Sequence, residues 1–181
     1  MVTPLKREYR YLDSDADREA FIADMRRVRQ DVIAFARSVP TDQWYTPRYS
    51  GWTLAAMLGH LQMMDTLTYW QVQLGAMGVA LPLSEGMLHQ FNGLMSRVFE
   101  KRQVETTLKG IEKSERKLCE YVKRLPMGRY SKLVYDPALS QYLTVEQAMQ
   151  EFFLYHWREH LDTLCGKDDQ PFIEPPMPNT V

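Results

Sequence analysis

The segment from Val145 to Leu164, VEQAMQEFFLYHWREHLDTL, constrains the fold of this chain more than any other. Its apolar residues recur at steps of three and four, which predicts one amphipathic helix. His156 and His160 fall on the apolar side of that helix, which a folded chain buries. Histidines four apart on a helix have Cβ atoms about 5–6 Å apart, so both can reach one cation. Because an unpaired polar group is costly to bury, this pair requires partners, and a metal ion is one candidate.

Length and composition predict one soluble globular domain that spans residues 1–181. Residues 1–13 show little periodicity and are expected to form an N-terminal arm. Residues 166–181 are rich in proline and are expected to form an extended tail. The formal net charge of -1 leaves no basic excess to neutralise phosphates, so we expect neither nucleic acid nor a membrane as a partner.

The cellular compartment is indicated by what the sequence lacks. No stretch approaches the about 20 consecutive apolar residues that a transmembrane helix needs. The N-terminal sequence MVTPLKREYRYLDSD has no apolar segment of the kind found in secretory signals. Cys119 and Cys165 lie far apart and form no Cys-x-x-Cys pair, so reduced thiols are the simplest expectation. Together these features favour a cytoplasmic protein.

Periodic apolar residues, caps and helix breakers predict an all-α fold with five helices. Ser14 is a candidate N-cap for the first helix, and Pro40 ends it. Thr53 is a good N-cap for the second helix. Thr144 begins a capping box before the last helix, and Gly166 is placed to end it. The predicted helices span residues 15–39, 54–74, 87–101, 105–125 and 145–164.

The most economical arrangement of these elements is a four-helix bundle with an extra short helix over residues 87–101. The connector 41–51 is rich in turn formers and aromatic residues, and the rings of Trp44, Tyr45, Tyr49 and the following Trp52 are expected to cover one end of the core. The longest connector, 126–143, carries a weak signal for a two-stranded excursion at 131–135.

Three of the four histidines fall on core-side positions, since His60 lies within the apolar pattern of the second predicted helix. Three neutral imidazoles with an open fourth position are typical of a catalytic divalent-metal centre. Imidazole suits zinc, nickel, copper and ferrous iron, so the ligand type does not select the metal. The alternative is that each histidine donates to a carbonyl or carboxylate within the core. For His89 we expect a structural or solvent-exposed role.

Other catalytic patterns fit this sequence less well. Residues 156–160, HWREH, match the His-x-x-Glu-His pattern of inverted zinc peptidases. Those enzymes need a further carboxylate ligand well downstream, where Glu174 lies in the proline-rich tail. A di-iron carboxylate bundle needs Glu-x-x-His on two helices, and the sequence has no such pair. The sequence also lacks a Gly-x-Ser-x-Gly elbow, a Walker A loop and a dinucleotide-binding fingerprint.

Two motifs of the chain resemble those of a known family. The segment Tyr49 to Trp70, YSGWTLAAMLGHLQMMDTLTYW, is similar to the GW-(S/T)-x6-HL signature of the DinB-like, or DinB/YfiT-like, superfamily. The segment HWREHLDTL is similar to its second signature, a His-x3-His pair near the C-terminus. Between them, Phe91-Asn92 and the segment LKGIEKSERKLCEYVKRLP follow in the order that the family shows. The resemblance covers roughly residues 15–165.

This resemblance implies a four-helix bundle with a long crossover connection, and a divalent metal (zinc, nickel or ferrous iron) held by His60, His156 and His160. Characterised relatives include transferases that use low-molecular-weight thiols such as bacillithiol or mycothiol, and a mycothiol-dependent maleylpyruvate isomerase. Several relatives are stress-inducible, and relatives are often homodimers. The resemblance therefore implies a low-molecular-weight thiol, a small-molecule substrate and a homodimer as expectations for this chain.

The leading functional hypothesis is a metal-dependent enzyme, a thiol S-transferase or a related transferase or hydrolase. A metal-bound thiol would have a lowered pKa and become a nucleophile at neutral pH. Glu159 and Asp65 are candidates to orient an imidazole or accept a proton, and Tyr69, Tyr155 and Trp157 are candidates for the pocket wall. The alternatives are a non-catalytic bundle that a metal stabilises or that senses metal, and a binding or dimer-interface module whose metal site is vacant.

Overall fold

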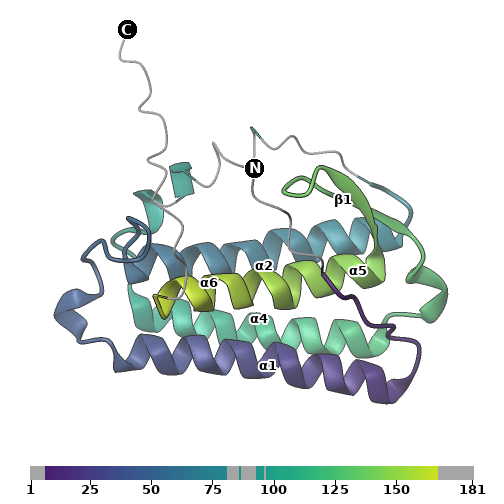
Figure 1. Cartoon of the computed structure of the whole chain (residues 1–181), viewed down its shortest axis with the longest axis horizontal. Coiled ribbons are helices and arrows are strands. Elements are labelled where there is room, and N and C mark those ends of the chain that lie inside the picture. The colour runs from purple at the N-terminus through teal and green to yellow at the C-terminus, as the bar shows by residue number, and fades with distance from the viewer. Residues whose placement is uncertain (1–6, 81–85, 87–92, 96, 167–181) are drawn as a thin grey trace, which may run out of the picture.

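Four long helical segments lie side by side in the computed structural model, which describes residues 7–80, 86, 93–95 and 97–166 (Figure 1). The first three are single helices, and the fourth changes its helical form partway along. These elements are α1 (Asp15–Ser38), α2 (Leu54–Ala76), α4 (Val104–Arg124) and a final segment made of α5 (Val145–Gln150), a π-helical turn (Glu151–Tyr155) and α6 (His156–Leu164).

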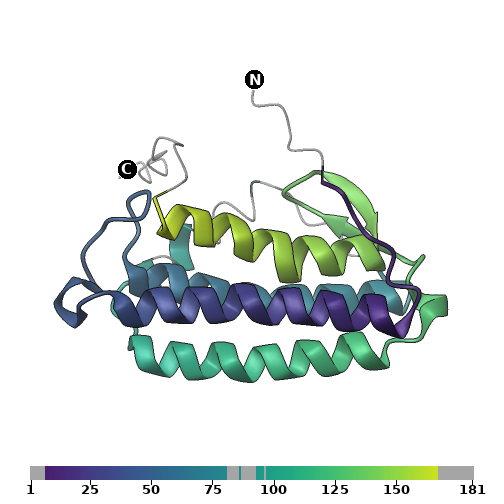
Figure 2. The same ribbon diagram turned by 60° about the horizontal axis from the view of Figure 1, so that its bottom comes forward.

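The connectivity confirms the predicted bundle with a long crossover. Helices α2 and α4 run in the same direction and pack against each other (Figure 1). The chain between them, residues 77–103, must therefore return along the length of the bundle. Helix α1 packs against both α4 and α6, as Figure 2 shows. The predicted short helix 87–101 lies largely outside the described residues, of which 93–95 and 97–99 are helical.

The helix ends confirm the caps that the sequence predicts. The Ser14 hydroxyl accepts the amide of Asp17 at the start of α1. Thr144 and Gln147 form both hydrogen bonds of a capping box at the start of α5. Gly166 has a φ of 67° just after α6, which is the left-handed conformation that commonly ends a helix. Helix α2 extends two residues beyond the predicted Leu74.

A small antiparallel hairpin closes one end of the bundle. Strand β1 (Leu133–Asp136) pairs with β2 (Gln141–Thr144), so that Leu133 lies opposite Thr144. Short 3₁₀ turns occur at Thr41–Gln43 and Met127–Arg129. The hairpin therefore confirms the weakly signalled two-stranded excursion, but its strands span 133–136 and 141–144 and so reach well beyond the predicted 131–135.

The core lies between the four helical segments, on the faces that the apolar periodicity predicts. Fully burying one large apolar side chain, such as leucine or phenylalanine, contributes about 1.5–3 kcal/mol to stability. The largest fully buried side chains are Phe21, Met25, Arg29, Leu54, Leu58, Leu61, Leu108, Ile111, Leu118, Phe153 and Trp157, together with Leu12 from the N-terminal arm.

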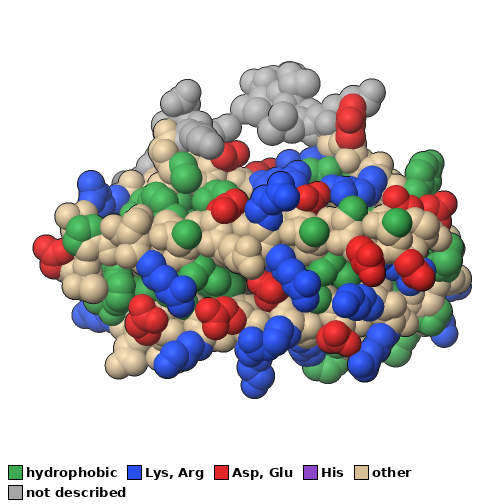
Figure 3. Space-filling model, turned by 90° about the horizontal axis from the view of Figure 1, so that it is seen from below, with side chains coloured by type: hydrophobic (Ala, Val, Ile, Leu, Met, Phe, Trp, Pro, Cys, Tyr) green, Lys and Arg blue, Asp and Glu red, His purple; other side chains and the backbone are tan. Residues whose placement is uncertain are grey.

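The outer face of α1 and α4 carries interspersed charges of both signs (Figure 3). Two ion pairs cross between these helices, Arg26 to Glu115 at 3.5 Å and Arg37 to Glu112 at 3.6 Å. Exposed pairs of this kind contribute little to stability. No histidine is visible on this face in Figure 3.

The described part of the N-terminal arm, residues 7–13, lies against the final helical segment. The side-chain amide of Gln150 pairs with the backbone of Arg10 in both directions, each hydrogen bond measuring 2.9 Å. The Tyr9 hydroxyl donates to Glu151 at 2.9 Å, and Leu12 is fully buried. The arm is thus part of the packed structure, although its sequence lacks periodicity.

None of the helices in the described part of the chain is both long enough and apolar enough to cross a membrane.

Gly75 provides a test of how tightly the hairpin packs against α2. A Cβ atom at this position would lie 2.4 Å from the Val134 side chain and 2.9 Å from the Leu133 carbonyl oxygen. We expect Gly75→Ala to lower the free energy of unfolding by about 1–3 kcal/mol, as overpacking does. Gly128→Ala is the matched control, since a Cβ there meets no atom within 4 Å. Urea denaturation of both variants measures the effect, and equal stability would contradict the close packing.

Candidate metal centre

The first histidine is positioned by a tight turn that leads into α2. Ser50 and Gly51 have positive φ angles of 47° and 83°, and the flanking Tyr49 and Trp52 exchange two backbone hydrogen bonds of 3.1 and 2.9 Å. This is the geometry of a two-residue hairpin turn of type I′, which favours glycine. Thr53 then caps α2 by accepting the amide of Ala56 at 3.0 Å.

The turn also places an aromatic ring against the site. The Trp52 ring lies edge-to-face with the His60 ring, with centroids 5.4 Å apart. The side chain of His60 is buried, at 3% exposure. Gly59 lies beside the Phe99 ring, where a Cβ atom would come within 2.6 Å of a ring carbon. Aromatic rings therefore restrict both the rotation of the His60 imidazole and the backbone of α2 beside it.

The other two histidines lie on α6, which begins with His156 directly after the π-helical turn. The backbone amide of His156 donates to the carbonyl of Glu151, five residues earlier. A π-helical turn inserts one residue into an α-helix and is frequent at functional sites. The turn therefore sets the rotation of α6 relative to α5, and with it the direction of His156 and His160. The single helix predicted over 145–164 is continuous in the structure, but it changes form in the middle.

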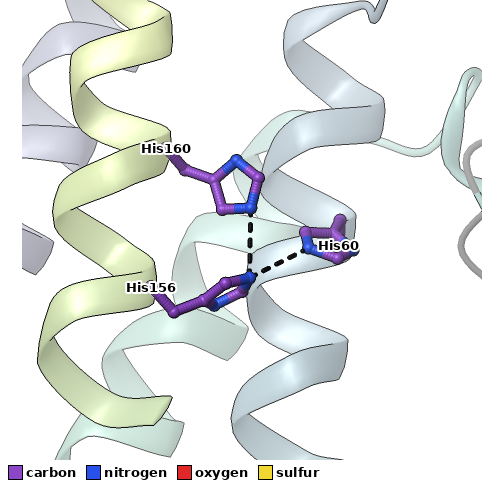
Figure 4. A group of neighbouring side chains, drawn as sticks. All are labelled: His60, His156 and His160. Carbon is purple, nitrogen blue, oxygen red and sulfur yellow. Dashed lines mark hydrogen bonds between the residues drawn. The ribbon is translucent and has the colours of Figure 1, made fainter. Parts of the chain in front are cut away.

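The three imidazoles point toward one another from two helices (Figure 4). The Nε2 atom of His156 lies 3.2 Å from Nε2 of His60 and 3.1 Å from Nε2 of His160. The ring planes are inclined at 63°, 71° and 90° to one another. The structure thus brings together all three residues that the sequence predicts as ligands.

Hydrogen bonding alone does not satisfy this arrangement. A ring nitrogen carries either a proton or a lone pair, so Nε2 of His156 cannot donate to one neighbour while accepting from the other. The Nδ1 atom of His60 is also buried and has no hydrogen-bond partner among the described residues. A shared cation resolves the conflict, because two nitrogens bound to one tetrahedral zinc lie about 3.3 Å apart. The donor set therefore fits a divalent metal.

Electrostatics favour the neutral form of these rings. Burial, followed by the charge of neighbouring His160, lowers the pKa of His60 well below its ordinary value. The same two causes lower the pKa of His156, with smaller contributions from His60, Arg29 and Arg7. Neutral imidazole is the form that binds metals. His60 is buried, whereas His156 and His160 are partly buried.

The two predicted carboxylates lie in contrasting environments. Asp65 is buried on α2, and its Oδ1 accepts hydrogen bonds from Arg29 at 2.7 Å and from the Trp157 indole at 2.9 Å. Burial raises the pKa of the Asp65 carboxyl, and these two partners oppose the shift. Glu159 is exposed on α6 and forms an ion pair with Arg7 of the N-terminal arm.

The three aromatic residues predicted for the pocket wall are also separated. Trp157 is fully buried in the core. Tyr155 donates to the Glu8 carbonyl at 2.7 Å and is covered by Arg7 of the arm. Tyr69 packs edge-to-face against Tyr121, accepts a hydrogen bond from Gln73, and has the Lys117 ammonium over its ring. The contacts seen for these side chains are thus with the core, the arm and α4.

Sequence reasoning missed Arg29, the one fully buried arginine among the described residues. Its position was detectable, because it lies four residues after Met25 and three before Val32 on the apolar side of α1. The π-helical turn has no comparable signal in the sequence. Trp52 was predicted to cover an end of the core, and its contact with His60 adds a specific role.

Comparison with known proteins bears on the fold. No protein-family model matches the chain, and no curated protein matches it at a significant level. Among solved structures it is similar to YfiT from Bacillus subtilis, described as a probable metal-dependent hydrolase with an unusual four-helix bundle topology. The TM-score is 0.71 at 16% identity, over 88% of this chain and 90% of that chain. This likeness confirms the bundle that the sequence resemblance implied.

The site predicts that a divalent metal stabilises the folded chain. We expect His60→Ala and His156→Ala to abolish stoichiometric metal binding, since each removes one of three nitrogen ligands. At a free metal concentration 100 times its Kd, the metal should add about 2.7 kcal/mol to the free energy of unfolding. Elemental analysis and thermal melts with and without chelator measure both effects.

His89→Ala is the control for these variants, because it also removes one histidine, and the sequence predicts a structural or solvent-exposed role for His89, which lies outside the described residues. It should bind metal as the wild type does. Full metal occupancy in both His60→Ala and His156→Ala would show that these histidines are not the ligands.

Proposed function

We propose that this chain is a divalent-metal-dependent enzyme whose three-histidine centre activates a nucleophile for attack on a small-molecule substrate. The convergence of three Nε2 atoms, with His156 3.2 and 3.1 Å from its two neighbours, is the observation that carries the proposal. Three histidines leave a fourth position for water or substrate, which is the feature that distinguishes catalytic from structural zinc sites.

The ligand set supports zinc, nickel or ferrous iron as the metal. Neutral imidazole is a good ligand for all three, and no thiolate or carboxylate belongs to the group among the described residues. A bound cation would supply Lewis acidity and lower the pKa of a water or thiol that occupies its open position. His156 and His160 are less buried than His60, so we infer that the open position faces their side of the group.

The chain's own residues would hold and orient this centre. Trp52 packs against the His60 ring and limits its rotation. Glu159 directly precedes His160 on α6 and is exposed. Of the two predicted carboxylates, it is therefore the better placed to exchange protons with solvent. Asp65 is held by Arg29 and Trp157, and its contacts support a positioning role.

Two kinds of nucleophile suit such a centre. Water would make the protein a hydrolase, and the description of the structurally similar YfiT supports this possibility. A low-molecular-weight thiol would make it an S-transferase, which the GW-(S/T)-x6-HL and His-x3-His motifs support through their family resemblance. A homodimer and a cytoplasmic location belong to the same proposal and rest on that resemblance and on the sequence composition.

A non-catalytic role for the metal is the competing hypothesis. A metal that only stabilises the bundle would also satisfy three buried or half-buried imidazoles. The three-histidine donor set favours catalysis, because a purely structural zinc site is closed by a fourth protein ligand and the group has none among the described residues. Activity measurements on the metallated protein separate the two hypotheses.

The first functional prediction concerns the nucleophile. We expect metal-loaded protein to hydrolyse an activated ester or amide, or to transfer a thiol such as bacillithiol to an electrophile, and the chelated protein to do neither. His156→Ala should reduce either activity to background, and His89→Ala should leave it unchanged. Product analysis by mass spectrometry distinguishes water from thiol as the attacking group. Inactivity over both panels, with a metal-dependent rise in stability, would support the non-catalytic role instead.

The second functional prediction concerns Glu159. We expect Glu159→Gln to lower kcat by about 100-fold while metal stoichiometry is kept, as the loss of a general acid or base typically does. Arg7→Gln is the matched control, since it breaks the same ion pair but retains the carboxylate. An unchanged kcat in Glu159→Gln would show that the residue serves only as the surface partner of Arg7.

A further inference from the structure

A buried arginine on α1 lies at the centre of an interhelical polar cluster. The Nη2 atom of Arg29 donates to Oδ1 of Asp65 at 2.7 Å, and both side chains are fully buried. Its Nη1 atom donates to the carbonyl oxygens of Phe153, at 2.8 Å, and Met25, at 3.2 Å. The guanidinium carbon lies 4.3 Å from the centroid of the Trp157 ring.

The same carboxylate joins a third element to the cluster. Oδ1 of Asp65 also accepts a hydrogen bond from the Trp157 indole at 2.9 Å. The cluster therefore links α1 through Arg29, α2 through Asp65, and the final helical segment through Trp157 and the Phe153 carbonyl. It is the only buried ion pair between the helices among the described residues.

The cluster contacts both elements that carry the histidines. Asp65 lies five residues after His60 on α2, and Trp157 directly follows His156 on α6. The Phe153 carbonyl belongs to the π-helical turn that is closed by the backbone amide of His156. A shift of either helix relative to the other would thus break contacts of this cluster and change the separation of the histidine nitrogens.

Stability alone is a poor explanation for such a cluster. Removing two charges from water is costly, and well-packed apolar residues often stabilise a core as well as a buried ion pair does. The Nε atom of Arg29 and the Oδ2 atom of Asp65 are buried and have no hydrogen-bond partner among the described residues. The cluster therefore retains unsatisfied polar atoms, and its geometry is better suited to fixing the relative position of three helices.

We propose that Arg29, Asp65 and Trp157 are positioning residues, whose cluster holds α2 and the π-helical turn in the register that brings the three histidine Nε2 atoms together. This inference rests on the proposed metal site. Arg29 is suited to the task because its planar, two-armed guanidinium contacts the Asp65 carboxylate and the Phe153 carbonyl at the same time. A lysine retains the charge but presents a single ammonium group.

The experiment compares two conservative variants of the full-length protein with a control. Arg29→Lys retains the charge, and Trp157→Phe retains an aromatic ring but removes the N–H that Asp65 accepts. Val122→Ala is the control, because Val122 is fully buried in α4, which carries none of the histidines. Urea denaturation of the metal-free proteins measures the stability lost in each. Chelator competition gives the Zn²⁺ affinity, and the visible absorption spectrum of bound Co²⁺ reports the ligand geometry.

We expect Arg29→Lys and Trp157→Phe each to bind Zn²⁺ about 10-fold more weakly than the wild type, and to alter the Co²⁺ spectrum. Val122→Ala should lose stability while keeping wild-type affinity and spectrum. If Arg29→Lys does not fold, Trp157→Phe decides the matter. Wild-type affinity and spectrum in the folded cluster variants would overturn this inference alone, as would an equal loss of affinity in Val122→Ala. A wild type that binds neither ion would overturn the metal site and this inference together.

Discussion

The close approach of three neutral imidazoles is the constraint on which the arrangement of this molecule depends. Rings whose nitrogens lie 3.1 and 3.2 Å apart must be held there by the helices that carry them. His60 and His156 are 96 residues apart in the chain, so no local structure brings them together. The long crossover does so indirectly. It leaves α2 and α4 parallel and in contact, and α2 also packs against the final helical segment.

Local sequence signals then refine the position of each ligand. The turn at Ser50 and Gly51 determines where α2 begins, and the cap at Thr53 fixes its first turn. The GW-(S/T) part of the motif thus has a physical meaning, because it supplies the turn, the ring against His60 and the helix cap. On the final segment, the corresponding control comes from a π-helical turn immediately before His156. One ligand is therefore positioned by a helix start and the other two by a change of helical form.

The features that could be predicted from the sequence are those whose cause is local. Helix periodicity and the caps at Ser14 and Thr144 depend on neighbouring residues, and the structure confirms them. The four-residue spacing of His156 and His160 likewise acts locally, and the two rings lie next to each other. His60 could be predicted as a third ligand because the apolar periodicity of its helix shows which face is buried. The π-helical turn and the surroundings of Asp65 could not be predicted, since the turn has no local sequence signal and both make contacts with Arg29 from another helix.

The exposed and buried carboxylates illustrate why spacing alone does not assign chemistry. Glu159 and Asp65 are each close in sequence to a predicted ligand, yet one pairs with the N-terminal arm and the other with a buried arginine. A buried carboxylate that is paired with an arginine is poorly suited to proton exchange, because protonating it would leave the Arg29 charge unpaired in a medium of low dielectric. The same pairing makes it effective at fixing geometry. Since three ligands must converge to within tenths of an ångström, a rigid, charge-paired contact between the helices is the physical requirement that the Arg29 cluster meets.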